Sequence, residues 1–186
     1  MPTYNIDDPH KKVYSLYVYT QLDNGEDILA GQLSIDRDSH RGAFKYARKY
    51  CRHPDAFALD PINLPLKEGQ IFEQPVTRTN MGVAGVLLDA GPDEWGKKVL
   101  KALLDPPPAN DIEFLMAGTG KGVGSLRFAR VRNEEPTTPL PREFRDLEDI
   151  MDTALMIDEG RPVPQEKAMY FEHGSAIGGS RPKTFI

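Results

Sequence analysis

The spacing of the hydrophobic residues changes once along this chain, near Gly82, and this change constrains the fold most. Before it, residues 13–19 (VYSLYVY) and 28–35 are runs rich in β-branched and aromatic residues, separated by the turn sequence DNG at 23–25. After it, apolar residues recur at helical spacing, and the sequence PDE at 92–94 is typical of a helix start. Antiparallel strands followed by helices predict the α+β class.

Finer features refine this outline. Gly31 is a candidate β-bulge, and further strands are predicted over residues 42–46, 57–59 and 123–130. The helix that starts at Pro92 is expected to end at the three prolines 106–108, and residues 111–116 to form another helical turn or two. A last amphipathic helix is expected to end near Gly160, with an apolar face made by Phe144, Leu147, Ile150, Met151, Ala154 and Leu155.

Composition narrows the classes of partner. The chain has 186 residues and a net charge of −5, which argues against direct DNA binding because there is no general basic excess to displace counterions. One local basic run stands out, and we interpret it as a solvated face, with a local binding patch as the other interpretation. It contains Lys45, Arg48, Lys49 and Arg52.

The cysteine content, the N-terminal residues and the apolar runs predict where the protein is located. The single cysteine, Cys51, excludes a disulfide framework and suits a reducing cytoplasm. The first twelve residues contain no apolar core of a signal peptide. No apolar run reaches the ~18 residues typical of a spanning helix. We therefore expect a cytoplasmic protein with no membrane partner.

Two patterns imitate functional sites. Residues 117–122 (AGTGKG) are similar to a phosphate-binding P-loop, but Leu115 stands at its first glycine position and Gly122 at its Ser/Thr position. The four histidines lie far apart, so no metal site is predicted. Cys51 and His53 are close only in sequence, which rarely gives an oriented catalytic pair.

The C-terminal part begins after the clearest linker of the chain, NEEPTTPLP at 133–141. Residues 174–186 combine adjacent glycines with Arg181 and Lys183, and exposed amides beside cations are what a phosphate group needs. We predict a domain over residues 10–131, a linker over 132–141, and a second part over 142–186.

Three segments together resemble the HipA family of bacterial toxin kinases. They are residues 87–100 (LLDAGPDEWGKKVL), 122–128 (GVGSLRF) and 178–183 (GGSRPK), in this order. The resemblance implies an antiparallel, β-rich N-terminal subdomain with packed helices, followed by the start of a kinase-like N-lobe. It further implies a Ser/Thr protein kinase of a type II toxin–antitoxin system that uses ATP and Mg²⁺. A helix-turn-helix, HipB-like antitoxin would be the partner, and an aminoacyl-tRNA synthetase the type of substrate for a full-length kinase.

By the same resemblance, the nucleotide-binding loop falls on Ile177, Gly178, Gly179, Ser180, Arg181, Pro182 and Lys183. Family members carry a regulatory serine where this chain has Ala176, so Ser175 is the candidate phosphosite. The family's catalytic and Mg²⁺-binding aspartates have no match in these residues, so no catalytic residue is assigned. The expectation is a chain that is inactive alone and needs no cofactor alone.

A different class of function stays open. The chain is then a non-enzymatic neutralising module that docks on a separately encoded kinase core. Trp95 is the candidate interface anchor for this role, and a core position is its other interpretation.

Overall fold

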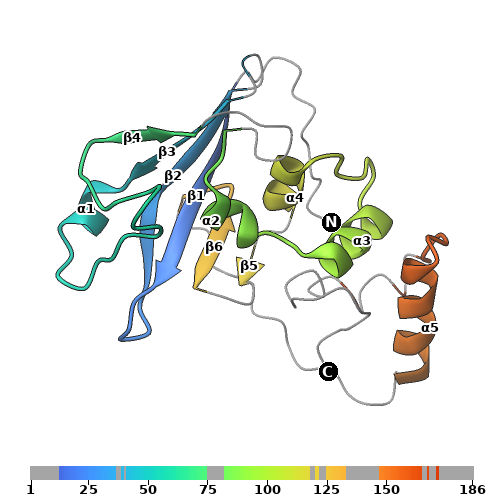
Figure 1. Ribbon diagram of the computed structural model, residues 1–186. Coiled ribbons are helices and arrows are strands. Elements are labelled where there is room, and N and C mark those ends of the chain that lie inside the picture. Colours follow the sequence, from blue (N-terminus) through green and yellow to red (C-terminus); the bar gives the residue numbers. More distant parts are fainter. Residues whose placement is uncertain are drawn as a thin grey trace. The chain divides into compact units, whose positions relative to one another are not determined.

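The computed structural model describes residues 13–36, 39, 41–74, 82–117, 120–121, 125–132, 147–164, 167 and 171. They belong to two compact units (Figure 1). The first unit contains residues 1–90 and 124–135, and the second contains residues 91–123 and 136–186. This division does not follow the linker, because residues on both sides of positions 132–141 share the second unit. The domain boundaries at 131 and 142 stay a prediction.

An antiparallel sheet forms the first unit, as the α+β prediction expects. Its strands lie in the order β4-β3-β2-β1-β6, and each is antiparallel to its neighbour. In Figure 1 their colours follow the sequence, from blue for β1 to yellow for β6. The bounds are Val13–Gln21 for β1, Asp27–Asp36 for β2, Arg41–Tyr46 for β3, Ile71–Glu73 for β4 and Leu126–Ala129 for β6.

The predicted irregularity in β2 lies one residue before Gly31. Val18 pairs with Gly31 and Tyr19 with Leu29, so Ala30 is the extra residue of the bulge. Gly31 serves another purpose. A Cβ atom there would lie 2.5 Å from the carbonyl oxygen of Lys45 and 2.5 Å from the ring of Phe44. Glycine is therefore needed where β3 and its aromatic ring pass close to β2.

One face of the sheet builds the core of the first unit. Alternating residues of each strand point to this face, as a half-buried strand requires. Tyr46 stacks on Tyr50 of helix α1 (Arg48–Cys51), with ring centroids 5.8 Å apart. The buried strand residues on this face include Leu16, Val18, Leu33, Ile35, Phe44 and Phe72.

The predicted strand over residues 57–59 is wrong, because this segment is a loop and the fourth strand lies at Ile71–Glu73. Two tyrosine hydroxyls satisfy its backbone in place of a strand ladder. The hydroxyl of Tyr50 donates to the carbonyl of Phe57 at 2.8 Å. The hydroxyl of Tyr46 accepts from the amide of Leu59 at 2.9 Å and donates to the carbonyl of Leu64 at 2.6 Å.

We expect Tyr46→Phe to lower the free energy of unfolding by about 1–3 kcal/mol, because two backbone groups lose a buried partner. Chemical denaturation measures this change. Tyr17→Phe is the matched control, since the Tyr17 hydroxyl makes no hydrogen bond to another described residue. Equal losses in the two variants would contradict the role given to Tyr46.

Burial also raises the pKa of Tyr46 to about 12, from an ordinary value of 10.0. The fold thus favours the neutral hydroxyl. This contribution to stability is complete below pH 10 and is lost as the pH rises through about 12.

Helix α2 (Gly85–Asp89) is the last element of the first unit before the chain enters the second unit at Gly91. In the second unit, helix α3 (Glu94–Leu103) begins at the N-cap Asp93, whose carboxylate accepts from the amide of Gly96 at 2.7 Å. Pro92 therefore precedes the cap instead of occupying the first turn. No helix formed by the described residues is long and apolar enough to cross a membrane.

The remaining elements of the second unit also follow local signals. Helix α4 (Asp111–Ala117) begins at Asn110, whose side chain exchanges hydrogen bonds with Glu113. The short strand β5 (Gly120–Lys121) follows it, so Ala117 ends a helix and Lys121 lies in a strand, which is the opposite of the strand-to-helix order of a P-loop. Helix α5 (Leu147–Asp158) ends as predicted before Gly160, which has φ +68°.

Candidate functional site

The predicted nucleotide loop, residues 177–183, and the candidate phosphosite Ser175 lie outside the described residues. Their roles therefore stay predictions. The candidate residues that the structure does place are Trp95 and the charged residues of the two units.

Trp95 lies in the core of the second unit. Its side chain has no exposed surface, and its ring meets that of Phe171 edge to face, with centroids 6.0 Å apart. The residues that enclose it come from α3, from α5 and from the segment after α5, and the buried ones are Val99, Ile150, Ile157 and Phe171. In this structure Trp95 thus occupies the core position that was its second interpretation, and it joins α3 to α5.

Helix α5 carries apolar residues on two sides. Ile150, Thr153 and Ile157 are buried at helical spacing, whereas Met151 is 63% exposed and Leu155 is 50% exposed. Met151 and Leu155 were predicted to lie on the buried face, and this was wrong. The buried side has the spacing i, i+3, i+7 and includes Thr153, whose hydroxyl donates to the carbonyl of Asp149 at 2.6 Å. Because Thr153 is polar, a prediction based on apolar residues alone did not include it in the buried face.

Ion pairs surround this core. Lys98 of α3 contacts Asp158 of α5 at 2.6 Å, and Lys167 contacts Asp149 at 2.8 Å. Lys97 reaches Asp111 at the start of α4, also at 2.8 Å. These pairs are partly exposed, so each contributes little to stability.

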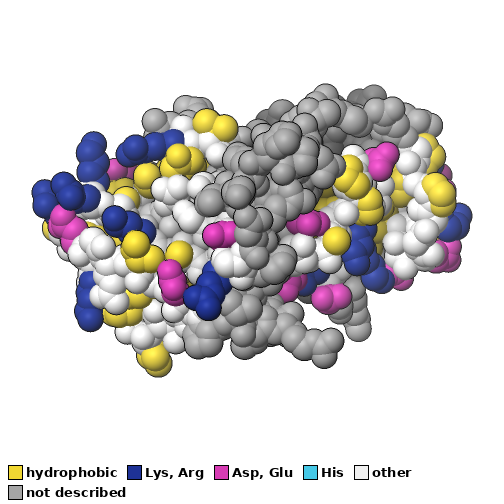
Figure 2. Space-filling view, turned by 90° about the horizontal axis from the view of Figure 1, so that it is seen from above, with side chains coloured by type: hydrophobic (Ala, Val, Ile, Leu, Met, Phe, Trp, Pro, Cys, Tyr) yellow, Lys and Arg dark blue, Asp and Glu magenta, His cyan; other side chains and the backbone are white. Residues whose placement is uncertain are grey.

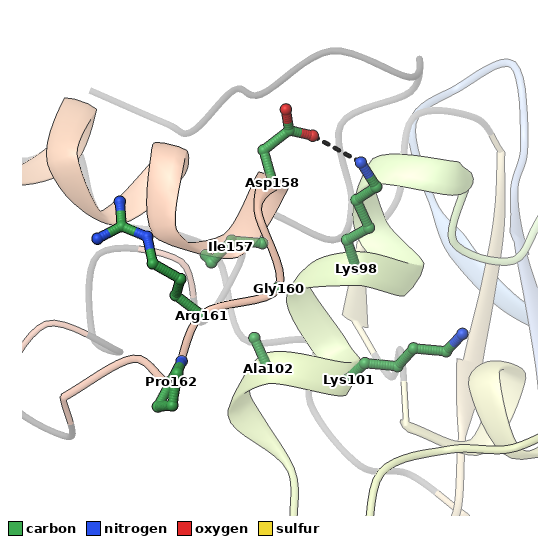
Figure 3. A pocket seen from close by; sticks show the side chains of 8 residues that line it. All are labelled: Lys98, Lys101, Ala102, Ile157, Asp158, Gly160, Arg161 and Pro162. Carbon is green, nitrogen blue, oxygen red and sulfur yellow. Dashed lines mark hydrogen bonds and ion pairs between the residues drawn. The ribbon is translucent and has the colours of Figure 1, made fainter.

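A pocket of about 390 Å³ opens between α3 and the end of α5 (Figure 3). Its cationic groups point away from one another. Lys98 is held by Asp158, the ammonium of Lys101 lies 5.6 Å from the ring of Phe114, and Arg161 contacts Glu159 at 2.6 Å. Apolar residues line the rest, namely Ala102, Ile157 and Pro162. A binding site needs convergent polar groups, and this pocket has none that converge.

No catalytic or metal-binding group emerges from the described part of the chain. It contains no cluster of three or more His, Cys, Asp or Glu side chains that could hold a metal ion. Burial, followed by the nearby charge of Glu68, raises the pKa of the Cys51 thiol, which disfavours the reactive thiolate. The ring of His53 accepts from the backbone amide of Asp55 at 3.2 Å.

The basic run is an exposed surface, as the solvated-face interpretation expects (Figure 2). Glu68 contacts Arg48 at 3.1 Å and Arg52 at 2.8 Å. The hydrogen bonds from Arg52 hold the pKa of Glu68 below its usual value, so the carboxylate is ionised at neutral pH. Lys45 and Lys49 lie outside this cluster, and neither contacts a carboxylate among the described residues.

The comparisons with known proteins identify a family for this chain. Residues 25–129 match the family model of the HipA N-terminal domain. The match covers more than half of the chain and spans β2 to β6, including Trp95 but not α5. No curated protein and no solved structure matches the chain.

Proposed function

The chain belongs to the HipA N-terminal domain family, and from this we propose that it forms the N-terminal portion of a HipA-like Ser/Thr protein kinase. The kinase would act as the toxin of a type II toxin–antitoxin system in the cytoplasm. The family match over residues 25–129 is the observation that carries this proposal. An HTH-type, HipB-like antitoxin is the proposed partner, and an aminoacyl-tRNA synthetase the proposed type of substrate.

The packing of α5 supports a chain that continues past the matched domain. Trp95 and Val99 lie within the match, whereas Ile150, Ile157 and Phe171, which bury them, lie beyond it. Described residues beyond the match, as far as Phe171, therefore share a core with residues inside it. The proposed nucleotide loop, residues 177–183, follows six residues later.

In this proposal the backbone amides of residues 178–180 face the phosphate oxygens of ATP, and Arg181 or Lys183 supplies positive charge. Mg²⁺ would be held by the aspartates of a complete kinase core. Ser175, beside Ala176, is the proposed site of regulatory phosphorylation.

The purified 186-residue polypeptide is expected to transfer no phosphate from Mg²⁺-ATP, because phosphoryl transfer depends on aligned catalytic and metal-binding groups. Radiolabelled ATP and calorimetry measure this. ATP binding is expected to be weak, with a Kd above about 100 μM, and Gly179→Val is expected to weaken it further, because a side chain would enter the space of the phosphates. Autophosphorylation of the polypeptide, or ATP affinity unaffected by Gly179→Val, would contradict the proposal.

A second candidate function is a non-enzymatic module that neutralises a separate kinase core. The net charge of −5 favours it, because an acidic module suits docking on a basic phosphate-binding cleft. The phosphotransfer assay separates the two candidates. A neutralising module added to an active HipA-like kinase lowers its autophosphorylation in proportion to the amount added, whereas the N-terminal portion of a kinase leaves it unchanged.

A further inference from the structure

We propose that Arg48 and Arg52 form a binding site for a single phosphate group, and that the carboxylate of Glu68 occupies this site when no phosphate is bound. We call Arg48 and Arg52 the arginine pair. The phosphate belongs either to a phosphorylated side chain of another protein or to free phosphate. The inference goes beyond the proposed kinase function and does not depend on it.

The fold holds the arginine pair on one side of helix α1. Arg48 starts the helix and Arg52 is its C-cap residue, so the two side chains lie four positions apart, about one helical turn. The other side of the helix is anchored, because Tyr50 is fully buried, stacks on Tyr46 and donates from its hydroxyl to the carbonyl of Phe57. The core of the first unit therefore fixes the positions from which the two arginines extend.

The two guanidinium groups converge on one point. Nε of Arg48 lies 3.1 Å from Oε1 of Glu68, and Nη2 of Arg52 lies 2.8 Å from the same oxygen. Nε of Arg52 also donates to the other carboxylate oxygen, Oε2, at 2.9 Å. Three nitrogen atoms from two side chains thus already surround an oxyanion, which is the arrangement that a phosphate group requires.

Glu68 is placed where a ligand can displace it. It lies in a turn before β4, and residues 67–70 are all exposed. Its ion pairs are exposed as well, since the side chains of Arg48 and Arg52 are 76% and 65% exposed. Exposed ion pairs contribute little to stability, so little is lost when a stronger anion displaces the carboxylate.

The ligand must offer more than a carboxylate does. A carboxylate from a partner would only replace Glu68 with an equivalent group. A phosphate monoester carries a charge of about −1.5 to −2 at neutral pH and has three terminal oxygens, so it accepts more donors than Glu68. Lys49 and Lys67, which are adjacent in sequence to Arg48 and Glu68, are exposed cations. They favour the more highly charged ligand.

Geometry and net charge favour one phosphate group over a nucleic acid. A DNA backbone presents phosphates in a row and is bound by cations spread along it, whereas the arginine pair meets at a single oxygen. The chain has a net charge of −5, so it has no general basic excess to displace the counterions of DNA.

A nuclear magnetic resonance titration of the 186-residue polypeptide tests this, because the arginine Nε–H signals report on the groups that contact Glu68. The ligands are inorganic phosphate, phosphoserine blocked at both ends, and blocked serine, all at matched ionic strength. The unchanged chain is expected to bind both phosphates with a Kd of about 1–10 mM, and blocked serine not at all. Glu68→Gln removes the competing charge and is expected to tighten binding of both phosphates about tenfold.

The two phosphate ligands distinguish the sources. Blocked phosphoserine that binds at least as tightly as inorganic phosphate assigns the site to a phosphorylated side chain, and weaker binding assigns it to free phosphate.

Cys51 supplies a second readout, because it is the single cysteine of the chain and lies in α1 between the two arginines. Burial, followed by the charge of Glu68, raises the pKa of its thiol. Glu68→Gln is therefore expected to speed alkylation by iodoacetamide at about pH 8 by about twofold, since more of the thiol is ionised. Bound phosphate returns negative charge to the site and should slow the reaction again.

Two further variants show whether the gain depends on the arginine pair. In Glu68→Gln/Arg52→Gln the gain in affinity is expected to disappear, because one of the two guanidinium groups is lost. Asp158→Asn is the matched control, since it removes the same charge from a partly exposed ion pair with Lys98 in the second unit, and it should leave phosphate affinity unchanged. Circular dichroism checks that each variant keeps the fold.

The proposal is overturned if Glu68→Gln binds phosphate no more tightly than the unchanged chain, if Asp158→Asn gains equally, or if the gain persists without Arg52. An alkylation rate of Glu68→Gln that phosphate does not change also contradicts it. A DNA duplex that binds more tightly than blocked phosphoserine at equal phosphate concentration overturns it as well, and assigns the surface to nucleic acid.

Discussion

Trp95→Ala is expected to lower the free energy of unfolding of the second unit by about 3–5 kcal/mol, because it deletes a large, fully buried aromatic side chain. The ring touches groups from α3, from α5 and from the segment at Phe171, so the cavity opens where these three segments meet. The loss is expected to be local. The sheet of the first unit has its own core and should keep its structure.

Hydrogen exchange resolves this effect by segment. Amides of α3 and α5 should lose protection in Trp95→Ala, while those of β1, β2 and β3 keep theirs. Trp95→Phe retains part of the ring volume and should cost less than the alanine variant. Leu155→Ala, on the exposed side of α5, is the control and should change stability by less than about 1 kcal/mol. Equal loss of protection in both units would contradict the independence of the two cores.

Gly31→Ala is expected to destabilise the first unit by about 2–3 kcal/mol, although it adds a single methyl group. The new Cβ atom would lie 2.5 Å from the carbonyl oxygen of Lys45, closer than real Cβ contacts allow. That carbonyl belongs to the β2–β3 ladder, where Gly31 pairs with Tyr46. The clash can be relieved only by moving the Lys45 carbonyl, and this weakens the hydrogen bonds between β2 and β3.

Gly85→Ala is the matched control for this experiment. No atom lies within 4 Å of a Cβ at Gly85, which starts the short helix α2. Alanine is the better helix former, so this variant should be neutral or stabilising by up to about 1 kcal/mol. Denaturant midpoints of the two variants should therefore move in opposite directions or differ widely. Similar midpoints would mean that Gly31 is not tightly packed.

The sequence predicted those elements that depend on local chemistry. The first three strands are confirmed because β-branched and aromatic runs with a DNG turn specify a hairpin at short range. The start of α3 and the end of α5 are confirmed to within two residues, because Asp93 and Gly160 act within one helical turn.

Elements that depend on distant partners were not predicted correctly. Residues 57–59 resemble a strand in sequence, but the hydroxyls of Tyr46 and Tyr50 form hydrogen bonds with their backbone. The bond between Tyr46 and Leu59 joins residues 13 positions apart, and no local sequence pattern predicts it. The buried side of α5 is fixed by its packing against Trp95 and Phe171. The number of apolar residues on each side of the helix does not tell whether Ile157 or Leu155 is buried. The nucleotide loop rests on the family resemblance.

The position of Phe171 has a consequence for the synthesis of this protein. Trp95 leaves the ribosome long before the residues that cover it, since α5 and Phe171 are translated afterwards. At translation rates of about 5–20 residues per second, the indole stays uncovered for roughly 4–15 s. During this interval the nascent chain presents an apolar helix to every chaperone and neighbouring chain it meets. The second unit is therefore completed late, after the last strand of the sheet has been made.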